Sequence, residues 1–195
     1  MAALEASRMR SDAARNRERI LAVAAVQLAR DPGANLDDVV RASGLARATV
    51  YRNFPNRAAL VDAVVDRALA LVADLLARSR PEDGDALAAL TRLTRAACAA
   101  GPEALVLLSL LHAGSTTVTD VATRRDGVLI DRLALDLVRR GQTTGEFRDD
   151  VPAIWLADQW FSLLQSALTH PLNDGRDAAV LLIAVFKGGA CGTAG

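Results

Sequence analysis

Apolar residues recur at three- and four-residue spacing through almost the whole chain, and this periodicity constrains the fold more than any other feature. Such spacing forms one face of an α-helix, whereas a half-buried β-strand alternates apolar and polar residues. No stretch of the 195 residues alternates in this way over more than a few positions. Aromatic residues make up only 4% of the chain, which also disfavours a β-sandwich or barrel. The sequence therefore predicts an all-α protein of about nine helices.

Helix breakers and capping residues divide the first part of the chain into four predicted helices. The first ends at Asp31-Pro32-Gly33, and the second begins after Asn35, a favoured N-cap residue, and ends at Gly44. The third covers residues 47–54, and the fourth, at about 57–80, is long enough to leave a small domain. Five further helices are predicted at 85–100, 102–112, 119–140 with Gly141 as its stop, 152–169 and 176–187.

The charges are distributed unevenly between a predicted head and a predicted body. Residues 1–57 contain ten basic and six acidic side chains, whereas residues 58–195 contain 13 basic and 17 acidic ones, so the head is positive although the chain is neutral overall. This asymmetry is typical of a domain that binds a polyanion. We expect a flexible basic arm over 1–12, a helix-turn-helix domain over 13–57, a body over 58–187 and a flexible tail over 188–195.

The second and third helices form a helix-turn-helix pattern around Gly44-Leu45-Ala46. In such a motif the later helix lies in the major groove of DNA. Its polar residues include groups that suit phosphate oxygens, together with Arg52 and Asn53, whose geometries suit guanine and adenine edges. Helical hairpins also occur in purely structural bundles, so the spacing alone leaves both interpretations open.

Residues 35–60, NLDDVVRASGLARATVYRNFPNRAAL, resemble the DNA-binding head of the tetracycline-repressor (TetR) family of bacterial regulators. The resemblance implies a homodimeric one-component repressor that binds a pseudo-palindromic, double-stranded operator and releases it when a small molecule binds the body. It also implies the DNA contacts. Phosphate contacts are expected from Thr49, Tyr51 and Arg57, and groove-facing positions are Arg47, Ala48, Arg52 and Asn53.

Two positions depart from the pattern of that family. Ala46 stands where a capping serine is common. The absence of the serine removes a helix cap that stabilises by about 0.5 to 2 kcal/mol. Asn53 stands where histidine is common, so the operator sequence does not follow from the resemblance.

The last two predicted helices are apolar on nearly every face, as expected for helices buried between two subunits. The alternative is that both helices only close the core of a monomer. The candidate dimer interface consists of Trp160, Leu163, Leu164, Leu168, Val180, Leu181 and Ala184.

A ligand pocket in the body would accept a largely apolar effector of unknown identity. Its candidate residues combine apolar side chains with a few polar groups, although each could equally be a core residue. His112 and His170 lie near predicted helix ends, where a capping role is favoured over ligation. The candidate pocket residues are Leu105, Leu108, Ser109, His112, Leu133, Leu137, Phe147, Trp155 and Gln159.

Enzyme motifs are absent from the sequence: it contains no Gly-x-Ser-x-Gly, no P-loop and no His-Glu-x-x-His pattern. Cys98 and Cys191 have no histidine or cysteine at ligand spacing. We therefore expect no catalytic or metal-binding residues and no cofactor.

No apolar run is long enough to span a membrane, and no secretory signal opens the chain, which favours a cytoplasmic protein. The alternative function is a helical dimer that carries a ligand or binds another protein, without specific DNA binding.

Overall fold

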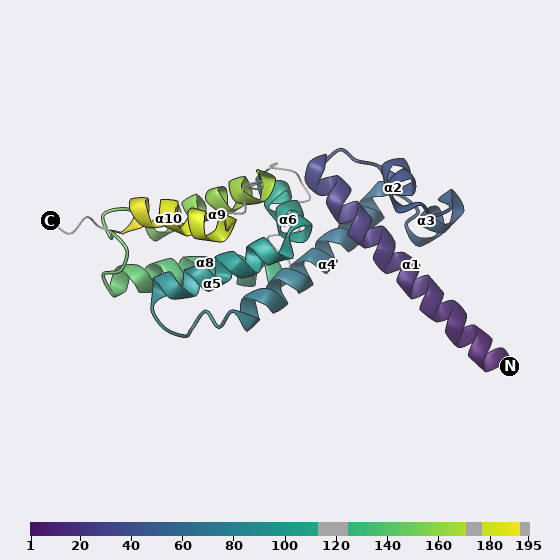
Figure 1. The fold of residues 1–195 in the computed structure, drawn as a ribbon, viewed down its shortest axis with the longest axis horizontal. Coiled ribbons are helices and arrows are strands. Elements are labelled where there is room, and N and C mark those ends of the chain that lie inside the picture. The colour runs from purple at the N-terminus through teal and green to yellow at the C-terminus, as the bar shows by residue number, and fades with distance from the viewer. Residues whose placement is uncertain (113–124, 171–176, 192–195) are drawn as a thin grey trace. The chain divides into compact units, whose positions relative to one another are not determined.

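The computed structural model describes residues 1–112, 125–170 and 177–191, and within these ranges the chain forms nine α-helices and no β-strand (Figure 1). This confirms the expected all-α fold. The chain divides into two compact units, a head of residues Met1–Ala68 and a body that begins at Leu69. The head extends past the expected boundary at residue 57 because the first turns of α4 (Arg57–Arg78) belong to it.

The head consists of α1 (Ala2–Arg30), α2 (Leu36–Ser43), α3 (Arg47–Asn53) and the start of α4. Asn35 begins α2 through a capping box: its side chain accepts hydrogen bonds from the backbone of Asp37 and Asp38, and Asp38 accepts one from the backbone of Asn35. Gly44 ends α2 with a positive φ of 66°, which only glycine adopts without strain. The core of this unit includes Ile20, Ala24, Val39, Val50, Phe54, Leu60, Val64 and Val65.

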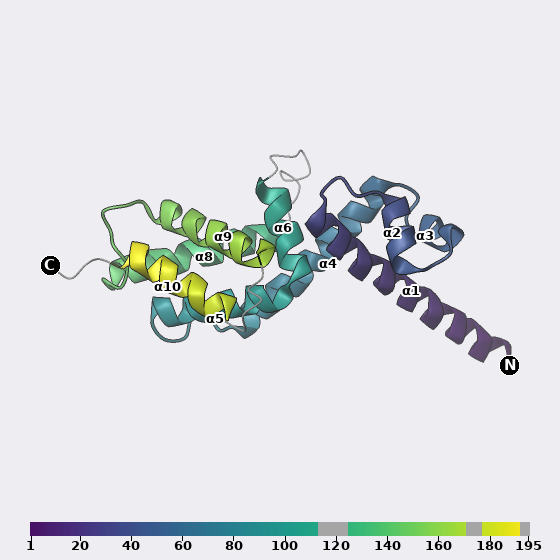
Figure 2. The same ribbon diagram turned by 45° about the horizontal axis from the view of Figure 1, so that its top comes forward.

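The expected flexible arm over residues 1–12 is instead the beginning of α1, so this prediction was wrong. The segment lacks an apolar period, but seven of its 12 residues are alanine, arginine, leucine or glutamate, and no glycine or proline precedes Pro32. These residues have high helix propensity, and a helix that is already anchored by packing at its C-terminal half extends without a further nucleation cost. In Figures 1 and 2 the N-terminal half of α1 extends away from α2 and α3, and Arg8 and Met9 are exposed.

The body is a bundle of α5 (Ala86–Ala100), α6 (Pro102–His112), α8 (Arg125–Thr143), α9 (Ala153–Thr169) and α10 (Ala178–Ala190). α5 packs against α6, α8, α9 and α10, and α9 packs against α6, α8 and α10 (Figure 2). Asp85 caps α5, because its side chain accepts a hydrogen bond from the backbone of Ala88. The core of the body includes Leu90, Leu93, Val106, Leu137, Val138, Leu164 and Phe186.

Gly141 does not end the helix that was expected to stop there, because α8 continues to Thr143. The glycine makes room for the ring of Phe147: a Cβ atom at Gly141 would lie 2.2 Å from Cδ2 of Phe147. The buried Phe147 ring also meets Phe186 of α10 edge-on, with centroids 5.8 Å apart. Gly145, with a φ of 76°, lies in the turn that follows α8. Gly141 is therefore a packing residue of the helix.

The predicted flexible tail also begins too early, because α10 continues to Ala190. Ala190 is buried, and its carbonyl oxygen accepts a hydrogen bond of 2.7 Å from the backbone of Arg148. This contact stabilises the last turn of α10 despite its two glycines. Residues 192–195 of the expected tail, and the first residues of the helix expected at 119–140, lie outside the described part of the chain.

No helix among the described residues combines the length and the apolar character needed to cross a membrane. Over the same residues, histidine, cysteine and acidic side chains do not gather into a group of three or more that could hold a metal ion.

Candidate nucleic-acid interface

Helix α3, which the sequence predicts to read DNA, is held by one buried side chain and presents several exposed ones. Val50 is completely buried, which fixes the rotation of α3 on the head. Arg47, Ala48 and Arg52 are exposed, and Thr49 is half-buried. As expected from the alanine at position 46, the N-terminus of α3 has no side-chain cap. Within this first turn the amide of Thr49 donates a hydrogen bond of 2.8 Å to the backbone oxygen of Ala46.

Arg47, Tyr51 and Asp37 form a closed cluster on the head. The Tyr51 hydroxyl donates a hydrogen bond of 3.0 Å to Oδ1 of Asp37 and accepts one of 3.0 Å from Arg47. Arg47 also forms an ion pair of 2.8 Å with the same oxygen, and its guanidinium lies 4.7 Å from the centroid of the Tyr51 ring. The hydrogen bond to Asp37 raises the pKa of Tyr51, with a smaller contribution from desolvation.

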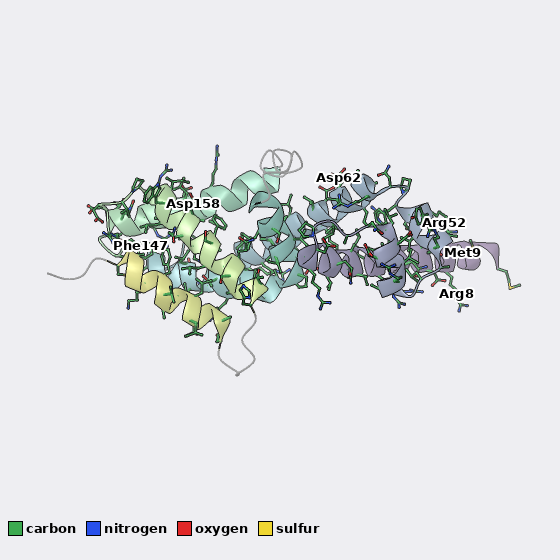
Figure 3. The ribbon with its side chains drawn as sticks, turned by 90° about the horizontal axis from the view of Figure 1, so that it is seen from above. Arg8, Met9, Arg52, Asp62, Phe147 and Asp158 are labelled. Atoms are coloured by element: carbon green, nitrogen blue, oxygen red, sulfur yellow. The ribbon has the colours of Figure 1, made fainter. Side chains whose placement is uncertain are left out.

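The two residues expected to read base edges differ in their surroundings. Arg52 projects from the exposed side of α3, where Figure 3 labels it. Asn53 is half-buried, and its Nδ2 atom donates a hydrogen bond of 2.8 Å to the backbone oxygen of Thr49. Because the Nδ2 group carries two hydrogens, this bond still leaves one N–H donor, together with Oδ1 as acceptor, for an adenine edge.

Arg57 at the start of α4 contacts the loop between α1 and α2. Its Nε atom donates a hydrogen bond of 2.9 Å to the backbone oxygen of Ala34, and Nη2 donates another to that of Pro32. The sequence predicts a phosphate contact for Arg57, but it gives no sign of this second role. The acceptors of Arg57 are backbone carbonyl oxygens. Every residue has such an oxygen, so the types of the residues in the loop do not indicate that Arg57 binds there. Arg57 therefore fixes the loop that precedes the helix-turn-helix motif.

Two residues of the expected dimer interface lie inside a single chain, which corrects that part of the prediction. Trp160 and Leu164 are each 3% exposed. The indole nitrogen of Trp160 donates a buried hydrogen bond of 2.9 Å to Oγ1 of Thr94. A buried indole N–H requires such an acceptor, and Thr94 on the otherwise apolar buried face of α5 was the signal that could have placed Trp160 in the core.

The other candidate interface residues lie at or near the surface of α9 and α10. Leu163, Leu168 and Leu181 are half-buried, whereas Val180 and Ala184 are exposed. Within a single chain α9 is not buried on every side, because Ile154 and Trp155 are 50% and 65% exposed. A groove of about 270 Å³ is lined by Leu163, Ser166, Ala167, His170, Ala178, Leu181, Leu182 and Val185.

The candidate pocket residues are distributed between the interior and the surface of the body. Leu108, Leu137 and Phe147 are buried, and Leu105, Ser109 and Leu133 are half-buried. Trp155 and Gln159 are exposed on α9, so in a single chain they do not face the interior. None of these residues lines the groove between α9 and α10. His112 ends α6, and its side chain lies outside the described part of the structure.

Comparisons with known proteins agree with the arrangement of the head. The family model described as bacterial regulatory proteins, tetR family, matches residues 20–64. A curated relative, the HTH-type transcriptional repressor LfrR of Mycolicibacterium smegmatis, is 28% identical over 152 residues, which cover 78% of this chain and 77% of LfrR.

Solved structures share the fold of the whole chain. The TetR-like regulator LfrR of Mycobacterium smegmatis in complex with proflavine has a TM-score of 0.69 at 23% identity, covering 92% of this chain and 98% of LfrR. AibR in complex with isovaleryl coenzyme A and operator DNA has a TM-score of 0.68 at 15% identity, covering 89% and 96%. KstR2 of Mycobacterium tuberculosis, a ketosteroid transcriptional regulator, has a TM-score of 0.66 at 15% identity, covering 91% and 95%.

Proposed function

We infer that this chain, which belongs to the tetR family of bacterial regulatory proteins, is a DNA-binding transcriptional repressor that responds to a small molecule. Regulators of this family bind operator DNA, act as dimers and bind small-molecule effectors. The observation that carries the inference is the exposed side of α3, with Arg47, Ala48 and Arg52 on a helix fixed by the buried Val50. The alternative of a helical dimer without specific DNA binding is not favoured, because the relatives are transcriptional regulators rather than carriers or enzymes.

We propose that α3 enters the major groove of the operator. Arg47, Ala48, Arg52 and Asn53 would face the bases, and Thr49 and Tyr51 would contact phosphates on either side. Arg57 would contact a phosphate while its Nε and Nη2 atoms hold the loop before α2. A two-fold dimer then requires a pseudo-palindromic operator, with half-sites about 34 to 36 Å apart or a multiple of this distance.

We propose that the dimer forms through α9 and α10. Support comes from the exposed apolar side chains on α10, since Val180 and Val185 are 49% and 60% exposed in a single chain. Leu163, Leu168, Leu181 and Ala184 would extend this apolar surface. Isolated valines are ordinary on a protein surface, but apolar residues that continue along two adjacent helices indicate an interface.

We propose that the effector is largely apolar and binds among the helices of the body. Leu105, Leu108, Leu133 and Leu137 would supply apolar contacts, and Ser109 would orient the ligand. Solved structures that share this fold include complexes with proflavine and with isovaleryl coenzyme A. α4 is continuous from the head into the body, so it is the helix through which we expect the effector to weaken DNA binding. A regulator of bacterial chromosomal DNA acts in the cytoplasm.

The proposed function is tested by equilibrium binding of the full chain to two DNA duplexes. One is selected by the protein from a random-sequence pool, and the other has the same composition in mixed order. The expected result is tighter binding of the selected duplex by about 10³-fold or more, with two protomers per duplex. Equal affinity for both duplexes would contradict the proposal. Arg52→Ala on the same pair of duplexes tests whether α3 is the reading element.

A further inference from the structure

One acidic side chain lies among the residues proposed to contact DNA. Asp37 belongs to the first turn of α2, and its Oδ1 atom binds both the guanidinium of Arg47 and the hydroxyl of Tyr51. A carboxylate at this place repels approaching phosphate groups and thereby lowers the affinity for every DNA sequence. An acidic residue at this place is therefore unfavourable for DNA binding unless it has another role. The contacts of Asp37 with Arg47 and Tyr51 suggest such a role.

The cluster holds Arg47 in a defined but reversible position. The side chains of Arg47 and Asp37 are 64% and 44% exposed, so water screens their ion pair and DNA is able to compete for the arginine. Arg47 is also hydrogen-bonded to Tyr51 and stacked on its ring. These contacts reduce the number of conformations that Arg47 samples before DNA arrives. A side chain held in this way binds best where the DNA group matches its position.

We propose that Asp37 is a positioning residue that determines the sequence discrimination of the head by holding Arg47 and Tyr51 in one arrangement. The proposal rests on the DNA-binding function proposed above. On cognate DNA, Arg47 leaves Asp37 for a base edge or phosphate at a matching position. On other sequences the ion pair between Arg47 and Asp37 persists, so Arg47 does not bind a phosphate group of the DNA. Specificity is a difference between two affinities, and Asp37 lowers the affinity for non-cognate DNA.

Tyr51 supplies an optical measurement of this cluster. It is the only tyrosine of the chain, so the absorbance of its phenolate during an alkaline titration reports on one residue. The hydrogen bond to Asp37 raises the pKa of Tyr51, and the positive charge of Arg47 opposes this effect. Replacing the carboxylate by a neutral amide leaves the charge of Arg47 in place and should lower the pKa of Tyr51.

The test compares Asp37→Asn with the wild type on the selected duplex and on the mixed-sequence duplex. Binding is measured by fluorescence anisotropy between about 50 and 200 mM salt. Each phosphate that a basic side chain neutralises releases counterions and makes the slope of log K against log salt steeper by about 0.9. Asp37→Asn frees Arg47, so the slope on the mixed-sequence duplex should steepen by about 0.9 per protomer. The ratio of affinities for the two duplexes should fall by about threefold or more.

Two control variants separate this role from a general effect of charge. Asp149→Asn removes one negative charge from an exposed side chain of the body and should leave slope and ratio unchanged. Asp37→Glu keeps the charge and should retain most of the discrimination. If Asp37→Asn does not fold, Asp37→Ser supplies a second neutral variant, because serine is well tolerated in the first turn of a helix.

Each outcome distinguishes the proposal from the function on which it rests. A wild type that discriminates the duplexes, together with an Asp37→Asn variant of unchanged slope and ratio, would overturn the role of Asp37 and leave the proposed function intact. An unchanged Tyr51 titration in that variant would overturn the cluster in solution. A wild type without discrimination would overturn the proposed function and this inference with it.

Discussion

Replacing Gly141 by alanine tests the packing of the turn after α8. A Cβ atom at this position would lie 2.2, 2.5 and 2.9 Å from Cδ2, Cε2 and Cγ of Phe147, closer than van der Waals contact allows. The ring is 2% exposed and packs edge-on against Phe186, so it has no open space to move into. The substitution therefore forces the ring, the helix or both to shift.

Two opposing terms determine the size of the effect. Alanine in place of glycine inside a helix stabilises by about 1 kcal/mol. Overpacking a core costs about 1 to 3 kcal/mol in general, and a displaced phenylalanine ring approaches the 3 to 5 kcal/mol of its removal. Because three ring atoms are too close, we expect the steric term to dominate and Gly141→Ala to destabilise by about 1 to 3 kcal/mol.

Thermal unfolding followed by circular dichroism at one fixed protein concentration measures this effect, which corresponds to a decrease in Tm of at least about 2 to 4 °C. Gly188→Ala is the matched control: Gly188 is also helical and exposed, and no atom lies within 4 Å of an added Cβ. This control should stabilise by about 0.5 to 1 kcal/mol. The packing interpretation is refuted if Gly141→Ala is as stable as the wild type or as Gly188→Ala.

Three further variants test the site and the body. Arg52→Ala should lower discrimination at one or two base pairs per half-site by about 1 to 3 kcal/mol in competition binding, whereas equal losses on all sequences would make Arg52 a phosphate contact. Arg57→Lys keeps the charge but loses the paired hydrogen bonds to the loop, so the salt slope should stay and the thermal stability should fall; a flattened slope with unchanged stability would contradict this. Burial disfavours the charged form of Glu146, but hydrogen bonds from the amides of Leu87 and Ala86 outweigh it and lower its pKa. The carboxylate therefore stabilises the protein above a pH of about 4.3 and loses this effect as the pH falls through the lowered pKa. The difference in free energy of unfolding between the wild type and Glu146→Gln should shrink in acid. A difference that stays constant with pH would refute the assignment.

The beginning and the end of α2 were predictable because local chemistry determines them. Asn35 and Gly44 act through their own backbone conformation and neighbouring amides, so their effects are visible in a short stretch of sequence. The exposed face of α3 was predictable for the same reason, since its apolar Val50 and the Phe54 that directly follows the helix are both buried. Here the sequence pattern and the structure agree.

Other features do not follow from the apolar period or from single capping residues. Gly141 was expected to end a helix, but a ring six residues later explains it. Arg57 binds backbone oxygens more than twenty residues away, and Trp160 finds its acceptor on α5. The arm was missed because high helix propensity extends α1 without any apolar period.

The central claim is that α3 reads a DNA sequence, and competition binding of the full chain tests it most directly. A labelled duplex selected from a random pool is bound at about 150 mM salt, and the selected and mixed-sequence duplexes are added separately as unlabelled competitors. The account predicts that the mixed-sequence duplex competes about 10³-fold less well for the wild type, and that Arg52→Ala reduces this ratio. Equal competition by both duplexes, or a ratio unaffected by Arg52→Ala and by Arg47→Ala, would contradict the claim.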